Sequence, residues 1–524
     1  MTEQKISEIS ISDAISHSQE ITKVELESLY YCGTYQVMVF IAFTAACFAF
    51  ASNLIFMTYC AWEPPWECYT GGEIVEYSNS TADKCSAFEN NQCVNITWSN
   101  VLFSSMVFEW NLLCNERKKV YLSITMQMAG HLFGVLLATQ ISDFYGRRVA
   151  LLTITAGHAI AGIGTSFCKK WEVFTAFRFV AGFFAIGLVS TSSVYLLESV
   201  GQKKRMVLMS LGGVNTGFIL TAGVAPLLGK WRLLCLCSGC AGAVSLAIIA
   251  LLNETPRWLV QRGKTSEARR VYLRILRLNC KSEKQLSETQ WDSFVERLKT
   301  RKTKRRSFWH LFSDSEISRK TVVVCQSMLS MTLISAVLLY SVNDLSGNLY
   351  ENYAVFASVR WAGGALGMLA DHFIPSLGRK LLMGILLAIV SCCFLALTIT
   401  EWLECNIPHL KNILIFIGAG AFSPVWIALL LAVMELYPTS MRSIATGFSG
   451  VFGEVGSVIM PQLLLLGSLW KPGMWLVLTI VCSCFLASFT AFIPETKGKP
   501  LTDDYVKKQK TQQPVPERTS SQSQ

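Results

Sequence analysis

Charge is scarce in this sequence of 524 residues. Only 16% of the residues are Asp, Glu, Lys or Arg, whereas 52% are apolar and the mean hydropathy is +0.39. In a soluble protein, about a quarter of the residues are charged. The chain has too little polar surface to cover itself in water, so we expect its outer face to meet lipid.

Motifs for catalysis and for nucleotide binding are missing as well. The sequence has no glycine-rich loop ending in Lys that would bind phosphates, no paired Cys-x-x-Cys or His-Glu-x-x-His metal site, and no Gly-x-Ser-x-Gly turn. We therefore expect neither an ATP-driven pump nor an enzyme, and no metal or cofactor. His131 and His158 stand alone in apolar segments, where we expect them to pack against other helices.

Long apolar runs are what the chain does have. A bilayer core is about 30 Å thick and needs about 20 apolar residues per helix, and long runs without alternation predict helices rather than strands. The fold class is therefore an all-α membrane protein with twelve transmembrane helices. The runs lie at about 35–58, 119–141, 149–168, 172–194, 206–228, 231–252, 321–341, 350–370, 381–400, 411–434, 443–467 and 473–493.

The net charge of +10 is unevenly distributed, which argues against nucleic acid as a partner. Segment 253–320 holds 18 of the 46 Lys and Arg, whereas 59–116 holds only Lys84 against eight acids. Basic residues gather on the cytosolic side of a membrane. We therefore expect both termini and segment 253–320 in the cytosol, where the basic surface would face anionic lipid headgroups.

The acidic segment after the first run has the features of an extracellular loop. The sequons at Asn79 and Asn95 both fall in it, and such sites are glycosylated only on the lumenal side. Five cysteines in this segment predict disulfides with one thiol left over, although the sequence does not give their connectivity. They are Cys60, Cys68, Cys85, Cys93 and Cys114.

Acid-then-base segments repeat in the two halves of the chain. "SDFYGRR" (142–148) matches "ADHFIPSLGRK" (370–380), "LESVGQKKR" (197–205) matches "MELYPTSMR" (434–442), and "NETPR" matches "PETKG". These segments follow equivalent spans, so charged pairs could gate the cytosolic end; anchoring at the interface is the alternative. The gating candidates are Asp143, Arg147, Arg148, Glu198, Arg205, Glu254, Arg257, Asp371, Arg379, Glu435, Arg442 and Glu495.

The repeat divides the chain into two bundles of six spans. The expected parts are a cytosolic N-terminus (1–34), a first bundle (35–252) with an extracellular loop (59–118), a cytosolic linker (253–320), a second bundle (321–494) and a cytosolic tail (495–524).

Several segments resemble known transporters. "DFYGRR" (143–148) and Arg178-x-x-x-Gly182 are similar to signatures of the major facilitator superfamily. "FEWNLLC" (108–114), "ETPRWLVQRGKTSEA" (254–268), "MELYPTSMR" and "PETKGKPL" (494–501) resemble solute carrier family 22, the organic cation, carnitine and organic anion transporters. The resemblance covers about residues 30–502. It implies alternating access, with a substrate site between two six-helix bundles at mid-membrane.

Two charges near the membrane midplane are the main candidates for substrate binding. Glu454 in "GFSGVFGEVGSVIMPQLLLLG" (447–467) and Arg360 each lie about 15 Å into their spans. Glu454 resembles a position that is acidic in the family's cation carriers, whereas Arg360 departs from the cation pattern. Three interpretations remain open: Glu454 attracts a cation, the two form a structural salt bridge, or they hold a zwitterion together. Proton coupling at Glu454 is a further possibility.

Other candidates in the spans are weaker. Tyr340 and Trp426 could stack on an organic cation, although core or lipid-facing roles are also common for such rings. Asn53 and Asn215 could line the cavity or form hydrogen bonds between helices. Arg178 belongs to a motif of the whole superfamily, and we expect it to be structural or part of a gate.

These features together predict a multi-pass plasma-membrane transporter of small organic ions, with organic cations favoured. A carnitine-like zwitterion carrier and an organic anion exchanger are the alternatives within this class. A receptor or scaffold with a transporter fold, which binds a ligand without moving it, is the alternative from another class. The expected partners are the small organic ion and membrane lipids.

Overall fold

The computed structural model describes most of the membrane part of the chain. The described residues are 33–70, 73–74, 85, 88, 90, 95–99, 101–280, 291–292, 295–296, 308–312, 314–374, 378–404, 407–437 and 439–495. Asn79 lies outside them, as do Cys93 and the greater part of both predicted cytosolic termini.

Long helices form the first half of the membrane part. They are α2 (Thr34–Cys60), α5 (Lys118–Tyr145), α6 (Arg147–Ser166), α7 (Trp171–Ser199), α8 (Gln202–Gly212), α9 (Val214–Leu228) and α10 (Trp231–Ala250). The span predicted at 206–228 is present as Val207–Leu228, but it is interrupted where Gly213 adopts an extended conformation between α8 and α9. Two consecutive glycines, Gly212 and Gly213, have little helical preference and allow the break.

The second half contains α14 (Ser315–Tyr340), α15 (Leu349–Phe373), α16 (Arg379–Trp402), α17 (Pro408–Leu436), α18 (Thr439–Leu469) and α19 (Lys471–Phe492). Within the described residues, eleven helices are long and apolar enough to cross a membrane. The twelfth position belongs to α15, whose 25 residues are long enough but include Glu351, Arg360 and Asp371. The predicted twelve-helix membrane fold is confirmed, with α15 as the twelfth span.

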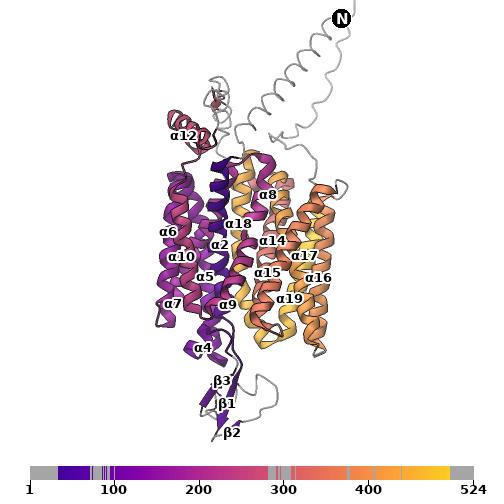
Figure 1. The fold of residues 1–524 in the computed structure, drawn as a ribbon. Coiled ribbons are helices and arrows are strands. Elements are labelled where there is room, and N and C mark those ends of the chain that lie inside the picture. The colour runs from indigo at the N-terminus through magenta and orange to yellow at the C-terminus, as the bar shows by residue number, and fades with distance from the viewer. Residues whose placement is uncertain are drawn as a thin grey trace, which may run out of the picture.

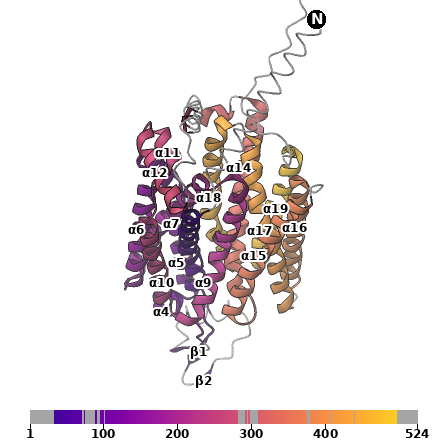
Figure 2. The same cartoon turned by 45° about the horizontal axis from the view of Figure 1, so that its top comes forward.

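Helices of each half pack mainly against one another (Figures 1 and 2). In the first half α5 packs on α7, and α6 and α2 pack on α10; in the second half α14 packs on α18, and α16 packs on α17 and α19. The two largest contacts between the halves are those of α5 with α18 and of α9 with α15. The two contacts are equivalent under the sequence repeat, in which span two corresponds to span eight and span five to span eleven. Span two contacts span eleven, and span eight contacts span five. We call this boundary between the halves the seam.

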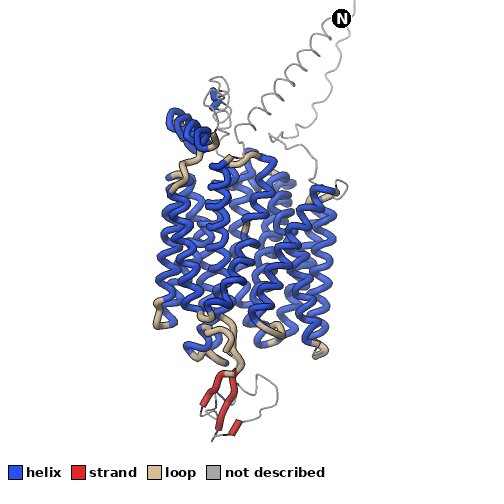
Figure 3. Tube along the Cα trace, in the orientation of Figure 1, coloured by secondary structure: helices blue, strands red, loops and turns tan. Residues whose placement is uncertain are grey.

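A small sheet extends from one end of the helices, opposite to α12 (Figures 1 and 3). Its strands are β1 (Trp66–Thr70), β2 (Glu73–Ile74) and β3 (Asn95–Trp98), in the antiparallel order β2-β1-β3. The short helices α4 (Met106–Trp110) and η1 (Cys114–Arg117) lead from it to α5. The sequence predicted a loop here without strands, because these strands are too short to show a periodic pattern.

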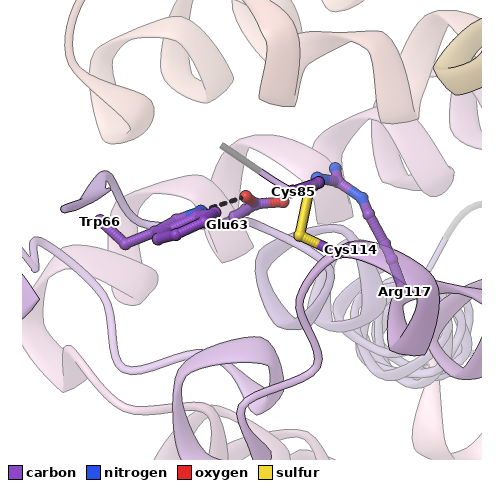
Figure 4. Close-up of a disulfide and its surroundings, with 5 residues drawn as sticks. All are labelled: Glu63, Trp66, Cys85, Cys114 and Arg117. Atoms are coloured by element: carbon purple, nitrogen blue, oxygen red, sulfur yellow. Dashed lines mark hydrogen bonds and ion pairs between the residues drawn. A yellow bond between two sulfur atoms is a disulfide. The ribbon is translucent and has the colours of Figure 1, made fainter. Parts of the chain in front are cut away.

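Disulfides stabilise this region. Cys85 is bonded to Cys114, beside Glu63, which accepts a hydrogen bond from the Trp66 indole and pairs with Arg117 (Figure 4). Cys68 is disulfide-bonded too. Cys60, offered as a disulfide candidate, is instead a free and buried thiol at the end of α2.

The linker segment after α10 contains α11 (Pro256–Gln261), α12 (Thr265–Leu278) and η3 (Phe308–Phe312). Ala268, Tyr272 and Ile275 are the buried residues of α12. They recur at helical spacing, so α12 is a short amphipathic helix. At its end, Asn279 accepts a hydrogen bond from the backbone of Tyr35 at 2.9 Å, which attaches the linker to α2.

Candidate functional site

Glu454 lies in the middle of α18, between glycines that bring this helix close to α14. A Cβ atom at Gly456 would lie 2.4 Å from the backbone oxygen of Leu329 on α14, so only glycine fits there. The backbone oxygen of Gly453 accepts a hydrogen bond from the Thr332 hydroxyl. The small residues around Glu454 in the sequence therefore serve helix packing, and they place an acid where two helices almost touch.

The carboxylate of Glu454 faces the other half of the molecule. Its Oε2 atom lies 3.8 Å from Nδ1 of His131 on α5, and the two side chains are 13% and 3% exposed. Arg178 and His158 act on His131 electrostatically from α7 and α6. This pairing across the seam was missed, because His131 was assigned to packing. The sequence signal that could have suggested this pairing is that both residues are titratable and lie in the middle of apolar spans. That their helices meet is visible only in the folded structure.

Arg360 is buried on α15, and among the described residues it has no acidic partner. Both of its terminal nitrogens donate to the Ser335 hydroxyl, at 3.2 and 3.3 Å, and its Nε has no hydrogen-bond partner. The guanidinium lies 5.5 Å from the ring centres of Phe218 and Phe356. Cation–π contacts compensate burial only in part, so this charge would gain from an anionic group.

One turn of α14 holds both charged residues at the same level. Ser335 bonds Arg360, and Thr332 bonds the backbone beside Glu454. Residues three apart on a helix lie on the same face. The salt-bridge interpretation expected an ion pair between Arg360 and Glu454. In this structure the two side chains form no such pair, because Glu454 faces His131 and Arg360 bonds Ser335.

Arg178 is fully buried in the first half and holds Asn53. Its Nη2 atom donates to the side-chain oxygens of Asn53 at 2.5 Å and Gln127 at 2.6 Å. Its guanidinium also lies 4.7 Å from the centre of the Phe56 ring. Asn53 thus takes part in bonding between helices, one of its two expected roles, and its amide nitrogen has no hydrogen-bond partner.

The remaining candidates in the spans differ in their surroundings. Asn215 on α9 donates to the Ser423 hydroxyl on α17 at 3.2 Å, so it connects the two halves. Tyr340, the last residue of α14, is buried and its hydroxyl has no partner. Trp426 on α17 is 39% exposed and is the least enclosed of the aromatic candidates. Among the three, Tyr340 offers an unsatisfied polar group in a buried place.

The gating candidates of the first half gather around the start of α6. Glu254 accepts from the backbone N–H groups of Arg147 at 3.0 Å and Arg148 at 3.1 Å, so its carboxylate caps the helix. Burial raises the pKa of Glu254, against the lowering effect of these N–H groups. The Arg147 side chain bonds Asp143 at 2.5 Å and Glu198 at 3.3 Å.

The second half repeats this arrangement at the start of α16. Glu495 accepts from the backbone N–H groups of Arg379 and Lys380, both at 3.0 Å. The Arg379 side chain pairs with Asp371 at 3.5 Å and with Glu435. Each cluster therefore joins elements of its own half. Bridging between the halves in another conformation stays a prediction.

The other gating candidates bind the backbone or lie apart from these clusters. Arg148 donates to the Ala250 oxygen at 2.9 Å, and Arg205 donates to the Val200 oxygen at 2.9 Å. Arg257 lies in α11. Arg442 lies in α18, but its side chain is outside the described part.

Comparison with known proteins identifies the family. The model of the family described as "Sugar (and other) transporter" matches residues 66–504. The chain belongs to this family of transporters. Its relatives include organic cation/carnitine transporter 4 of Arabidopsis thaliana, 27% identical over 90% of this chain and 88% of that one. Organic anion transporter 3 of Sus scrofa is 27% identical over 76% of this chain and 73% of its own.

The transporter also resembles solved structures. The E. coli xylose transporter XylE, described as partially occluded and inward open, superposes with a TM-score of 0.64 at 16% identity, covering 89% of this chain and 100% of that one. This likeness shows the major facilitator fold. Together with the family model and the spanning helices, it identifies a multi-pass membrane transporter.

At the end that carries the sheet, aromatic rings and hydrogen bonds join the two halves of the transporter. Tyr59 of α2 packs against Tyr353 of α15, with ring centres 4.5 Å apart and the rings inclined by 37°. Asn343 donates to the Thr58 oxygen at 2.9 Å and accepts from the Tyr353 hydroxyl at 3.0 Å. The halves are therefore held together at this end.

Proposed function

We propose that this transporter carries small zwitterions across the plasma membrane by alternating access. In this proposal Arg360 binds the carboxylate of the substrate, and Glu454 binds its cationic group. The observation that carries it is the buried Arg360 guanidinium, which has hydroxyl and aromatic neighbours but no acid. A substrate carboxylate would supply the missing negative charge, and charged hydrogen bonds of this kind are worth about 1.5–3 kcal/mol.

An organic cation is the second candidate, and the sequence favoured it. Glu454 supports it, because its Oε2 atom has no hydrogen-bond partner and a substrate cation could approach it. A pure cation would leave the charge of Arg360 uncompensated, which makes this candidate weaker. The relatives include carriers named for cations and carnitine and for anions, so family membership is compatible with both.

Three solutes of matched shape would distinguish the substrate classes. Glycine betaine is a zwitterion, its amide is a cation, and 3,3-dimethylbutanoate is an anion with the same outline. A longer series consists of the zwitterion γ-butyrobetaine, its cationic amide and the anion 5,5-dimethylhexanoate. We expect saturable uptake of a zwitterion, in cells with equal surface expression, to exceed that of its two partners. Preference for the amide would support the cation candidate, and saturable binding without uptake would support a receptor.

We further propose that the sheet-bearing end is extracellular and that both termini are cytosolic. The strands β1 and β3, with the sequon at Asn95, lie at the end opposite to helix α12 of the basic linker, which supports this orientation. Asn79→Gln and Asn95→Gln should each remove a glycan and so raise the electrophoretic mobility of the protein isolated from cells. Asn253→Gln should leave the mobility unchanged. A glycan at Asn253 would contradict the orientation.

A further inference from the structure

Among the ion pairs between described residues, only the pair of His131 and Glu454 joins the two halves of the molecule. Nδ1 of His131 and Oε2 of Glu454 are 3.8 Å apart, on α5 and α18. The two helices form one of the two largest contacts of the seam. A change in the charge of this pair therefore acts directly on the contact that alternating access has to loosen and re-form.

The charges around the pair are few and can be counted. From α7, Arg178 contributes one positive charge, which is held by the neutral side chains of Asn53 and Gln127. From α6, His158 is the other titratable group acting on His131. From α14, the residues that face α18 here are Thr332 and Leu329, which carry no charge.

Buried charges are costly unless they are compensated. With one proton, the pair is neutral overall, whether the proton resides on His131 or on Glu454, because the two groups titrate as one unit. Without the proton, Glu454 carries an uncompensated negative charge. The cationic group of a substrate would restore neutrality, but a proton and that group together would not, since they would leave a net positive charge beside Arg178.

We propose that His131 and Glu454 form a site for one positive charge, occupied in turn by a proton and by the cationic group of the substrate, so that the transporter exchanges its substrate for protons. This inference rests on the proposed role of Glu454 in substrate binding. In each cycle one substrate moves one way and one proton moves the other way, and the proton leaves the pair into the solution toward which the site is open. His131 is the positioning residue that lowers the cost of holding the proton in a buried place.

Purified transporter in liposomes tests this inference, with the membrane potential clamped by K⁺ and valinomycin. γ-Butyrobetaine and its amide serve as probes, since both carry the cationic group. An acid interior should increase uptake several-fold over equal pH, and a protonophore should abolish the increase. At equal pH on both sides, the KM should rise by up to about tenfold per pH unit toward acid, because one proton competes with one cation.

The variants separate this role from a structural one. His131→Gln should slow exchange and flatten the pH dependence of KM, and Glu454→Gln should remove both binding of the cationic group and the gradient response. His409→Gln, which changes an exposed histidine near the start of α17 that does not act on the pair, is the control and should keep the gradient response. Melting curves of the purified variants show whether each is folded.

The outcomes distinguish the two proposals. Substrate counterflow at equal pH without any effect of the gradient in the wild type would overturn the exchange mechanism and leave the proposed function intact. A full gradient response in folded His131→Gln would also overturn the role of this pair. Absence of counterflow of all probes in the wild type would instead contradict the proposed substrate class.

Discussion

Glu254 and Glu495 occupy the same place in the two halves of the molecule. Each carboxylate accepts hydrogen bonds from the first two backbone N–H groups of a spanning helix, α6 for Glu254 and α16 for Glu495. The N-terminus of a helix carries partial positive charge and unsatisfied donors. The acids of the "NETPR" and "PETKG" segments are thus helix caps, which gives the repeat a structural function.

Removal of either cap should lower stability. Replacing Glu254 or Glu495 by Ala leaves two donors of the helix unsatisfied, and we expect a loss of about 1–2 kcal/mol, with a smaller loss for Gln. Melting of the purified transporter in detergent measures this. Glu267→Ala on α12 is the control, because Glu267 forms only an exposed pair with Lys264 and such pairs contribute little. Equal melting of all three variants would disprove the capping role.

Gly378 provides a second test of the same cap. A Cβ atom at this position would lie 2.2 Å from Oε2 of Glu495, although the backbone there, with φ of −64°, suits any residue. Gly378→Ala should therefore destabilise by pushing the carboxylate away from the helix. In a double-mutant cycle, adding Gly378→Ala to Glu495→Ala should cost much less than it does alone. Additive effects would show that the methyl group clashes with something else.

Arg360 should determine the preference for carboxylates. Arg360→Gln removes the buried cation, and we expect the KM for a zwitterion to rise about 10- to 100-fold, corresponding to a charged hydrogen bond of about 1.5–3 kcal/mol. The KM for the matched amide should change much less. Arg360→Lys keeps the charge without the planar fork and should fall between. Equal losses for both solutes, at normal surface expression, would mean that Arg360 is structural.

The contact between Tyr59 and Tyr353 should control access to the sheet-bearing end. Tyr353→Ala removes the ring that packs against Tyr59 and the donor to Asn343, so the two halves should separate there more often. Cys60, a free buried thiol beside Tyr59, reports this opening. We expect its maleimide labelling, measured by mass spectrometry of the Cys60 peptide, to become several-fold faster. Tyr353→Phe, which keeps the ring, is the control, and unchanged labelling in Tyr353→Ala would contradict the prediction.

The bond between Cys85 and Cys114 should stabilise the loop region against unfolding. It joins residues 29 apart, and closing a loop of that length is worth about 3–4 kcal/mol in the chain-entropy account. Cys85→Ser and Cys114→Ser should reduce surface expression to the same extent, and the double variant should be no worse than either. A double variant clearly worse than both singles would show that each thiol has a separate role.

The sequence alone determined the class of the molecule and most of its helices. Apolar runs long enough to span a bilayer are a local property, and so is the uneven distribution of basic residues, because both follow from the cost of placing polar groups in lipid. The repeat of "SDFYGRR" and "ADHFIPSLGRK" is equally visible in one dimension. Glu454 and Arg360 could be selected in the same way, since an ionised side chain in an apolar run is rare.

Only the tertiary structure decided which of these groups meet. His131 and Glu454 are on helices far apart in the sequence, and nothing in either segment indicates that α5 packs on α18. The sequence likewise does not indicate that Arg360 bonds Ser335, or that Cys60 lies apart from the disulfide-bonded cysteines of the loop. Burial energy depends on composition along the chain, whereas pairing depends on which helix faces are brought together, and that is fixed by the packing of the whole bundle.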